Sequence, residues 1–283
     1  MTISLRSVCI ALLVLFAAAC QSEQVPPAEP GGFVQWALPD KLREISGLAL
    51  TSDGRLLAVT DEEAVVYEID YRNGSLVKAF AIGRPAIRGD FEGVAVLAGK
   101  VWLMTSNGRL YTFDEAADGQ RVPYERIGTG LRDQCEFEGL TADEQAGRLL
   151  LICKESRKKK KGLRIFEWLA AGDSDQEAIE VFLDEDAMSE SIGKKHVNPS
   201  GVTIDPATGN LIVVAAKQRA VFELARDGRL IDVIMQLDSK RHRQAEGIAI
   251  TVDGHLLIAD EANKGPARLA IYSQKRTGKT PGE

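Results

Sequence analysis

The chain repeats one short phrase, whose third copy reads Glu136-Phe137-Glu138-Gly139-Leu140. The related copies share its glycine and the apolar residue after it, and they are Glu44-Ile45-Ser46-Gly47-Leu48, Asp90-Phe91-Glu92-Gly93-Val94, Asn198-Pro199-Ser200-Gly201-Val202 and Gln244-Ala245-Glu246-Gly247-Ile248. The copies begin at residues 44, 90, 136, 198 and 244, so their spacings are 46, 46, 62 and 46 residues. A fixed period of this length indicates a repeat architecture, with an insertion in the third unit.

Each unit has the pattern of four short β-strands. In the first unit, apolar and β-branched residues fill the segments 47–50, 56–60, 65–69 and 76–82. Asp53-Gly54 and Asn73-Gly74 lie between two pairs of these segments, as is typical of hairpins. The three- and four-residue apolar spacing of a helical solenoid is missing. The pattern predicts an all-β fold, a five-bladed β-propeller with four-stranded blades.

The last unit lacks a fourth strand, because only a polar tail follows Leu269-Ala270-Ile271-Tyr272. Segment 33–38, which precedes the first unit, is similar to the fourth strands of other units. We expect this segment to complete the last blade and close the ring, which removes open sheet edges. The insertion, residues 168–196, is expected to be an excursion on one face.

The N-terminus has the features of an export signal. Arg6 precedes an apolar run at 8–16, and small residues lead to Cys20. Segment 16–20 resembles the lipobox of bacterial lipoproteins, although Ala17 stands where Leu is commonest. We therefore expect Cys20 to carry a lipid that anchors the chain to the membrane. The alternative is an ordinary signal peptide that contains a cysteine.

The expected organisation has four parts. Residues 1–20 are the signal with its cysteine, 21–32 a flexible tether with three prolines, 33–274 the propeller and 275–283 a polar tail. Gln21 rather than Asp follows the cysteine, which favours the outer membrane of the bacterial envelope, facing the periplasm. The net charge of −6 weighs against a nucleic-acid partner.

The propeller region resembles the SdiA-regulated family, a set of five-bladed propellers distantly similar to NHL-repeat proteins. The residues that carry this resemblance are Trp36, 44–48, Cys135, 137–140, Lys154-Glu155 and 244–247. The resemblance implies a calcium-binding propeller without an established reaction. Asn198-Pro199-Ser200 departs from the acidic pattern of the other copies, so the implied metal site is asymmetric.

Acidic side chains recur beside the repeat glycines. The residues directly before the glycines are Ser46, Glu92, Glu138, Ser200 and Glu246, and those two positions earlier are Glu44, Asp90, Glu136, Asn198 and Gln244. Carboxylates that converge on a narrow mouth repel one another unless a cation neutralises them, and calcium prefers such oxygen ligands. We expect a calcium site built from the carboxylates and two serines of this set. The alternative is neutralisation by ion pairs with Lys154, Lys217 or Arg132.

A second set of polar residues follows the second strands. Its candidates for a ligand-binding rim are Asp61, Lys154, Glu155, Lys217, Asp260 and Glu261. We expect them to open onto the same face as the acidic ring, because each hairpin returns toward it. A basic run at 157–161 lies on that rim. Solvated loop ends are the alternative for both groups.

Catalytic motifs are scarce. The three histidines are His196, His242 and His255, and no hydrolase or nucleotide-binding spacing accompanies them. We expect a binding module for a small polar ligand or an envelope protein. The alternative is a metal-dependent hydrolase of phosphate esters or lactones, phytase-like or lactonase-like, that uses the same acidic mouth.

Two cysteines remain in the propeller, Cys135 and Cys153. Their positions are symmetric about residue 144, inside an expected turn, so they could face each other across an antiparallel pair. The sequence leaves open whether they form a disulfide or remain two buried thiols.

Overall fold

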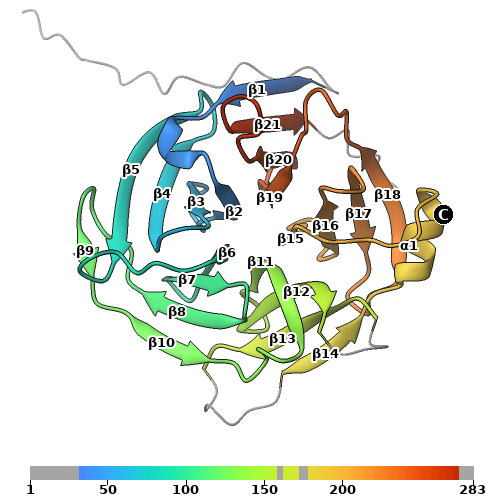
Figure 1. Ribbon diagram of the computed structural model, residues 1–283, viewed down its shortest axis with the longest axis horizontal. Coiled ribbons are helices and arrows are strands. Elements are labelled where there is room, and N and C mark those ends of the chain that lie inside the picture. The colour runs from blue at the N-terminus through green and yellow to red at the C-terminus, as the bar shows by residue number, and fades with distance from the viewer. Residues whose placement is uncertain (1–31, 158–161, 172–177, 274–283) are drawn as a thin grey trace, which may run out of the picture.

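Five sheets surround a central axis, and each places its first strand nearest that axis (Figure 1). The computed structural model describes residues 32–157, 162–171 and 178–273. The first blade contains β2 (Ile45–Leu50), β3 (Leu56–Thr60), β4 (Val65–Asp70) and β5 (Ser75–Ile82), and the second β6 (Phe91–Leu97), β7 (Lys100–Thr105), β8 (Arg109–Phe113) and β10 (Glu125–Gly128). The third contains β11 (Cys135–Asp143), β12 (Arg148–Ser156), β13 (Arg164–Leu169) and β14 (Ile179–Phe182). The fourth contains β15 (Gly201–Ile204), β16 (Leu211–Ala215), β17 (Ala220–Leu224) and β18 (Leu230–Gln236), and the fifth β19 (Ala245–Ile250), β20 (His255–Asp260) and β21 (Arg268–Ser273). The predicted five-bladed propeller is confirmed.

The N-terminal strand β1 (Phe33–Ala37) supplies the outer strand of the fifth blade. It runs antiparallel to β21, with Phe33 opposite Tyr272, and the centroids of these two rings lie 5.0 Å apart. The Arg241 guanidinium covers Phe33 at 4.1 Å from the ring centroid. The predicted closure of the ring by this strand is therefore consistent with the sheet order.

The core lies between adjacent blades. One cluster joins Leu57 and Val59 of the first blade to Phe91 and Leu103 of the second, all fully buried. This packing of facing sheets follows from the apolar alternation in the strands. Near the axis the repeat glycines allow close contact, since a Cβ at Gly201 would lie 2.5 Å from the Glu246 carbonyl oxygen of the next blade.

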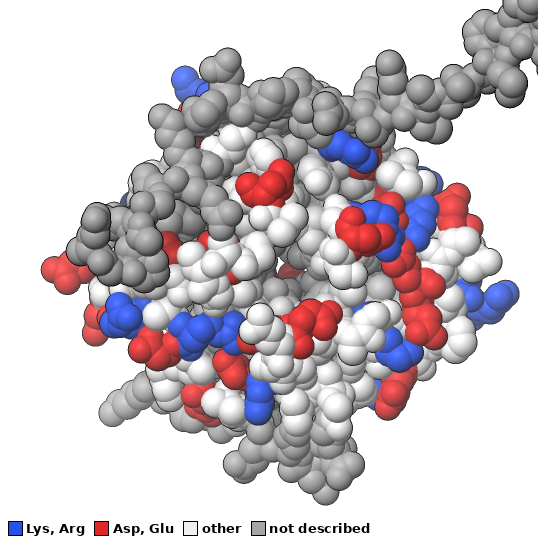
Figure 2. Space-filling view, turned by 180° about the vertical axis from the view of Figure 1, so that it is seen from behind, with Lys and Arg blue, Asp and Glu red and all other residues white. Residues whose placement is uncertain are grey.

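The axial channel is narrow as a consequence. Its constriction is a cavity of about 10 Å³ lined by glycines of all five phrases. Figure 2 shows the face opposite to the view of Figure 1, with a small hollow at the centre of the ring. Any cavity large enough for a small ligand therefore lies at the ends of the channel rather than within the ring.

Four of the five inner strands contain a β-bulge at the residue before the glycine. The pairing shifts between Ile45 and Gly47, and likewise in β6, β11 and β19. A bulge redirects a side chain and ends regular pairing. The sequence alternation alone did not predict these bulges, which place Ser46, Glu92, Glu138 and Glu246 outside the ladder.

The structure adds a short strand, a helix and a 3-10 turn to the expected set. A short strand, β9 (Arg121–Val122), runs parallel to β5 and widens the first sheet. The insertion is not only an excursion, because it supplies β14, the outer strand of its own blade. It also supplies α1 (Glu185–Ser191), whose N-terminus is capped by Asp184 and which lies beside β18 (Figure 1). A 3-10 turn at Asp40–Leu42 leads from β1 into the first blade.

Cys135 and Cys153 are joined by a disulfide, with their Cα atoms 5.5 Å apart. The symmetric hairpin predicted that the two cysteines lie directly opposite each other, and in the structure they do not. Cys153 pairs with Phe137, and Cys135 pairs with Ser156, because the β11 bulge shifts the register. The bridge thus spans the bulge that carries Glu138.

Several sequence predictions lie outside the described residues. These are the lipidated Cys20, the tether, the polar tail and Lys158 to Lys161 of the basic run. Within the part of the chain that the structure describes, no helix has the length and apolar character needed to cross a membrane.

Candidate functional site

The carboxylates of the repeated phrases gather at one end of the channel, which we call the acidic mouth. Its members are Glu44, Asp61, Asp90, Glu92, Glu136, Glu138, Glu246 and Glu261. The inner strands begin at this end and the second strands return to it, as shown by the pairing of Ala245 with Asp260 and of Ile45 with Thr60. The sequence prediction that both sets share one face is therefore correct for these residues.

Glu92 has the most strongly perturbed of the carboxyl groups described at the mouth. Burial raises the pKa of Glu92 to about 9, and the carboxylates of Glu138 and Asp90 add to the rise. An unfolded glutamate would be ionised at neutral pH, whereas the folded mouth favours a proton on Glu92. A cation beside it would reverse that preference.

Carboxyl groups of the fifth and first blades also have raised pKa values. Burial raises the pKa of Glu261 to about 8, and Glu44 contributes next. Burial also raises the pKa of Asp61, again followed by Glu44. The buried Asp61 Oδ1 has no hydrogen-bond partner among the described residues. We call Glu44, Asp61, Asp90, Glu92 and Glu261 the acidic half of the mouth.

A lysine of the third blade pairs with carboxylates of the acidic mouth. Lys154 Nζ donates to Glu138 and lies 3.5 Å from Glu136 Oε1. These pairs hold the pKa of Lys154 above its usual range, although burial opposes the shift. Of the ion pairs that the sequence suggested, this one forms, and its direct contacts are with the two acids of the third blade.

The two ring serines hold neighbouring blades together. Ser46 Oγ donates to the Phe91 carbonyl, and Ser200 Oγ donates to the Ala245 carbonyl, each at 2.6 Å. Ser200 Oγ also accepts from the Ala216 amide. Both hydroxyls are buried and already bonded, so the carboxylates remain the better candidates for metal ligands.

Not every candidate of the rim lies open to a ligand. Asp260 is buried, and its Oδ2 contacts His242 Nδ1 at 2.7 Å, while His242 Nε2 contacts the Tyr272 hydroxyl at 2.6 Å. This chain of contacts ties the loop before β19 to the closing blade. Glu155 and Lys217 are exposed at the rim. The sequence placed Asp260 with the rim because spacing alone does not reveal a histidine packed over it.

The remaining ring positions form amide contacts. Gln244 donates to Glu261, and Gln218 donates to Asn198 Oδ1 at 3.2 Å.

Burial raises the pKa of Glu246 to about 7, with Glu138 as the next cause. Across residues 32–157, 162–171 and 178–273, no three His, Cys, Asp or Glu side chains are already drawn together as a metal cluster. The carboxylate oxygens present are nevertheless the kind of ligand that calcium prefers. The raised pKa of Glu92 means that the described cations do not offset the effect of burial on its ionised form.

Comparison with known proteins places this geometry in a family. The SdiA-regulated family model matches residues 35–265. The crystal structure of glutaminyl cyclase from Myxococcus xanthus has a TM-score of 0.56 and 15% sequence identity, covering 86% of this chain and 97% of that one. A luciferin-regenerating enzyme has a TM-score of 0.54 and 12% identity, covering 87% and 96%. A search of curated proteins gives no match. At these identities the solved structures share the fold alone.

Proposed function

The chain belongs to the SdiA-regulated family, and we propose that it is an envelope-anchored lipoprotein whose calcium-containing mouth binds a polar ligand or an envelope protein. The proposal rests first on the acidic half. There, several carboxylates from different blades have raised pKa values because burial and like charges oppose their ionisation. A divalent cation supplies the positive charge that the described part of the acidic half lacks.

Calcium fits this donor set better than other metals. The available groups are carboxylate oxygens, which calcium accepts in irregular sets of six to eight ligands. Zinc would favour Cys and His, and both cysteines of the propeller are in the disulfide. We assign Glu92 and Asp90, both in the acidic half, as the principal ligands. Bound calcium would hold the carboxylates ionised and present a positive centre to an oxygen-bearing ligand.

Calorimetric titration of the metal-stripped protein tests this assignment. Calcium should bind, Glu92→Gln should weaken binding at least tenfold, and magnesium should substitute poorly because it requires a tighter octahedral shell. Asp205→Asn, in a turn between β15 and β16 at the other channel end, is the matched control for loss of one carboxylate. Absence of calcium binding, or equal loss in both variants, would refute the site.

The anchor at Cys20 gives the mouth its orientation. Ala37 of β1 pairs with Arg268 near the mouth, whereas Phe33 pairs with Tyr272 toward the other end of the blade. The chain therefore enters the propeller from the face opposite the mouth, and a tether from Cys20 leaves the mouth free to face the periplasm. Palmitate labelling tests the anchor: the wild-type chain should incorporate the label and fractionate with the outer membrane, and Cys20→Ala should do neither.

The histidines favour binding over hydrolysis. His242 is buried against Asp260 and Tyr272, His255 pairs with Asp253, and the exposed His196 lies beside Glu185 of α1. His242 contacts Asp260, the neighbour of Glu261, but its two ring nitrogens are already engaged by Asp260 and Tyr272, which leaves neither nitrogen free to act as a general base. Chromogenic phosphate esters and lactones should therefore show no calcium-dependent turnover. Turnover that Glu92→Gln abolishes would establish the hydrolase instead.

A further inference from the structure

A cavity of about 300 Å³ opens at the mouth between the third, fourth and fifth blades. This volume lies at the lower end of the range for small-molecule sites. The charged side chains that line it are Glu138, Lys154, Lys217, Arg243 and Glu246. It lies away from the first two blades, which carry most of the acidic half. Its charges are of both signs, whereas those of the acidic half are negative.

Two of the residues that line the cavity, Lys217 and Arg243, form its cationic part. Lys217 follows β16, and Arg243 precedes β19. Arg243 Nη1 donates to the carbonyls of Asn263 and Lys264 at 2.7 and 3.0 Å, which fixes the guanidinium without neutralising it. Neither cation forms an ion pair with any carboxylate of the described residues, although the protein carries a net negative charge. This part of the lining thus offers two positive groups to an anion.

Two glutamates, Glu138 and Glu246, form the anionic part of the lining. Glu138 is paired with Lys154, and Glu246 from the next-but-one blade lies beside them without an ion pair of its own among the described side chains. A second ammonium group would find its counter-charge at Glu246. Side chains of both charges therefore line the cavity, and Lys217, Arg243 and Glu246 form no ion pair with any described side chain.

We propose that this cavity binds a small zwitterion, an amino acid or short peptide, with its carboxylate at Lys217 and Arg243 and its ammonium at Glu246. A simple anion would meet repulsion from Glu138 and Glu246, and a simple cation would be repelled by Lys154, Lys217 and Arg243. A molecule that carries both charges can pair with the cations through its carboxylate and with Glu246 through its ammonium group. The inference rests on the proposed function only in placing a ligand at the mouth, and it requires no calcium.

The test is calorimetry on the mature chain, with and without calcium, using the twenty amino acids and glycylglycine as probes. At least one probe should bind with a Kd below about 1 mM. The best probe is then compared with its analogue lacking the ammonium group and its analogue lacking the carboxylate. Each analogue should bind at least tenfold more weakly. Equal binding of either analogue, or no binding by any probe, would overturn the proposal.

Three variants locate the two ends of the ligand. Lys217→Met and Arg243→Met should each weaken binding at least tenfold, as should Glu246→Gln. Arg229→Met removes an exposed cation before β18, at the other channel end, and should leave the affinity unchanged. A loss in Arg229→Met equal to that in Lys217→Met would also overturn the proposal.

Calcium titration of the same samples separates this inference from the proposed function. Zwitterion binding without calcium binding would support the cavity and refute the metal site. Calcium binding without zwitterion binding would support the metal site and refute the cavity as a zwitterion site. Lys217→Met should retain the calcium affinity of the wild type, because Lys217 is not among the proposed ligands.

Discussion

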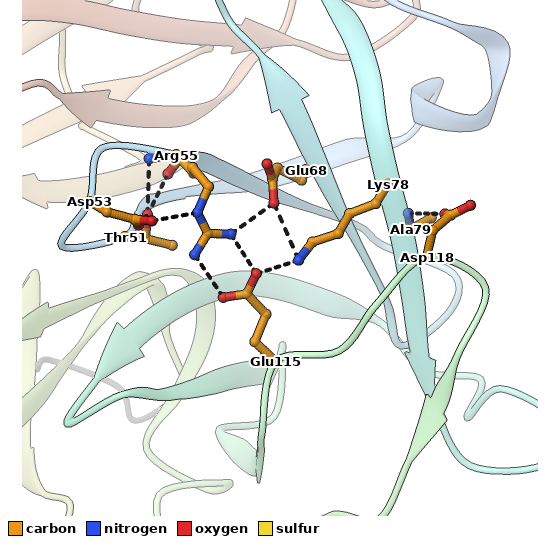
Figure 3. A network of polar contacts seen from close by, with 8 residues as sticks. All are labelled: Thr51, Asp53, Arg55, Glu68, Lys78, Ala79, Glu115 and Asp118. Atoms are coloured by element: carbon orange, nitrogen blue, oxygen red, sulfur yellow. Dashed lines mark hydrogen bonds and ion pairs between the residues drawn. The ribbon is translucent and has the colours of Figure 1, made fainter.

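The acidic half of the mouth differs sharply from a second charged region at the other end of the first blade. This second region, which we call the Arg55 cluster, contains Asp53, Arg55, Glu68, Lys78 and Glu115 (Figure 3). Arg55 contacts Glu68 at 2.8 Å and Glu115 at 2.5 Å, and Lys78 contacts Glu115 at 2.5 Å. Glu115 belongs to the second blade, so the cluster joins two blades.

The two regions treat the same side chain in opposite ways. The pKa of Glu115 is lowered, with the hydrogen bond from Arg55 as the largest cause, whereas burial raises the pKa of Glu92 to about 9. In the Arg55 cluster, the cations come from the protein. In the acidic half, no carboxylate forms an ion pair with a described cation, and the nearest ammonium group, that of Lys154, pairs with Glu138 and Glu136. The Arg55 cluster therefore holds its carboxylates ionised within the fold, whereas burial disfavours the ionised form of Glu92, as the proposed cation site requires.

The comparison depends on a closed ring, and opening the ring should have the largest effect. Deleting residues 33–37 removes β1 and exposes the edge of β21. We expect aggregation or a fall in melting temperature of more than about 10 °C, measured by calorimetry. Replacing the same five residues by threonine, which retains strand propensity, should cost less. A truncated chain that melts like the full one would contradict closure by β1.

Loss of the disulfide should have the next largest effect. The bridge closes a short loop, with a sequence separation of 18 residues, and holds the bulge of Glu138. Its removal in Cys135→Ser/Cys153→Ser should cost about 3 kcal/mol of unfolding free energy in urea titration. Thiol titration of the unfolded, unreduced chain without residues 1–20 should find no free thiol. Two free thiols would show that the bridge does not form.

Matched substitutions should separate the two charged regions. Glu115→Gln should destabilise the protein by about 1–2 kcal/mol, because Arg55 and Lys78 lose a partly buried partner. Glu92→Gln should leave the metal-free protein as stable at pH 8 or slightly more so, because it removes a carboxylate that the fold disfavours. Urea titration measures both. Equal destabilisation would show that Glu92 is paired as Glu115 is.

The pH dependence of stability should have opposite signs in the two regions. The pKa values of Glu92 and Glu246 are raised to about 9 and about 7. The stability that these two groups contribute to the fold is therefore present below about pH 4.5 and lost as the pH rises through 7 to 9. The pKa of Glu115 is lowered and that of Asp53 is lowered to about 2, so the stability that these two groups contribute is lost as the pH falls below 4 toward 2. Metal-free protein should therefore melt several degrees lower at pH 9 than at pH 5, and Glu92→Gln should flatten that slope. A melting temperature that rises between pH 5 and 9 would contradict the assignment.

Much of the fold follows from the repeat in the sequence, because period, strand alternation and turn residues are local signals. The bulges are less visible, since the residues Glu92 and Gly93 are compatible with a regular strand. The Arg55 cluster was missed because Arg55 and Glu115 are 60 positions apart in the sequence, and only the contact between blades brings them together. The sequence identified the mouth carboxylates and Lys154, but it could not show that Asp260 is buried beneath His242.

Calcium binding should release protons, and this release tests the central claim most directly. At pH 7 the carboxyl group of Glu92, with a pKa of about 9, retains a proton that a calcium ion bound to its oxygens would displace. Calorimetric titration in buffers of different ionisation enthalpy counts those protons. We expect about one or more protons released for each calcium ion, and fewer in Glu92→Gln. Calcium binding without proton release, or no calcium binding, would contradict the account.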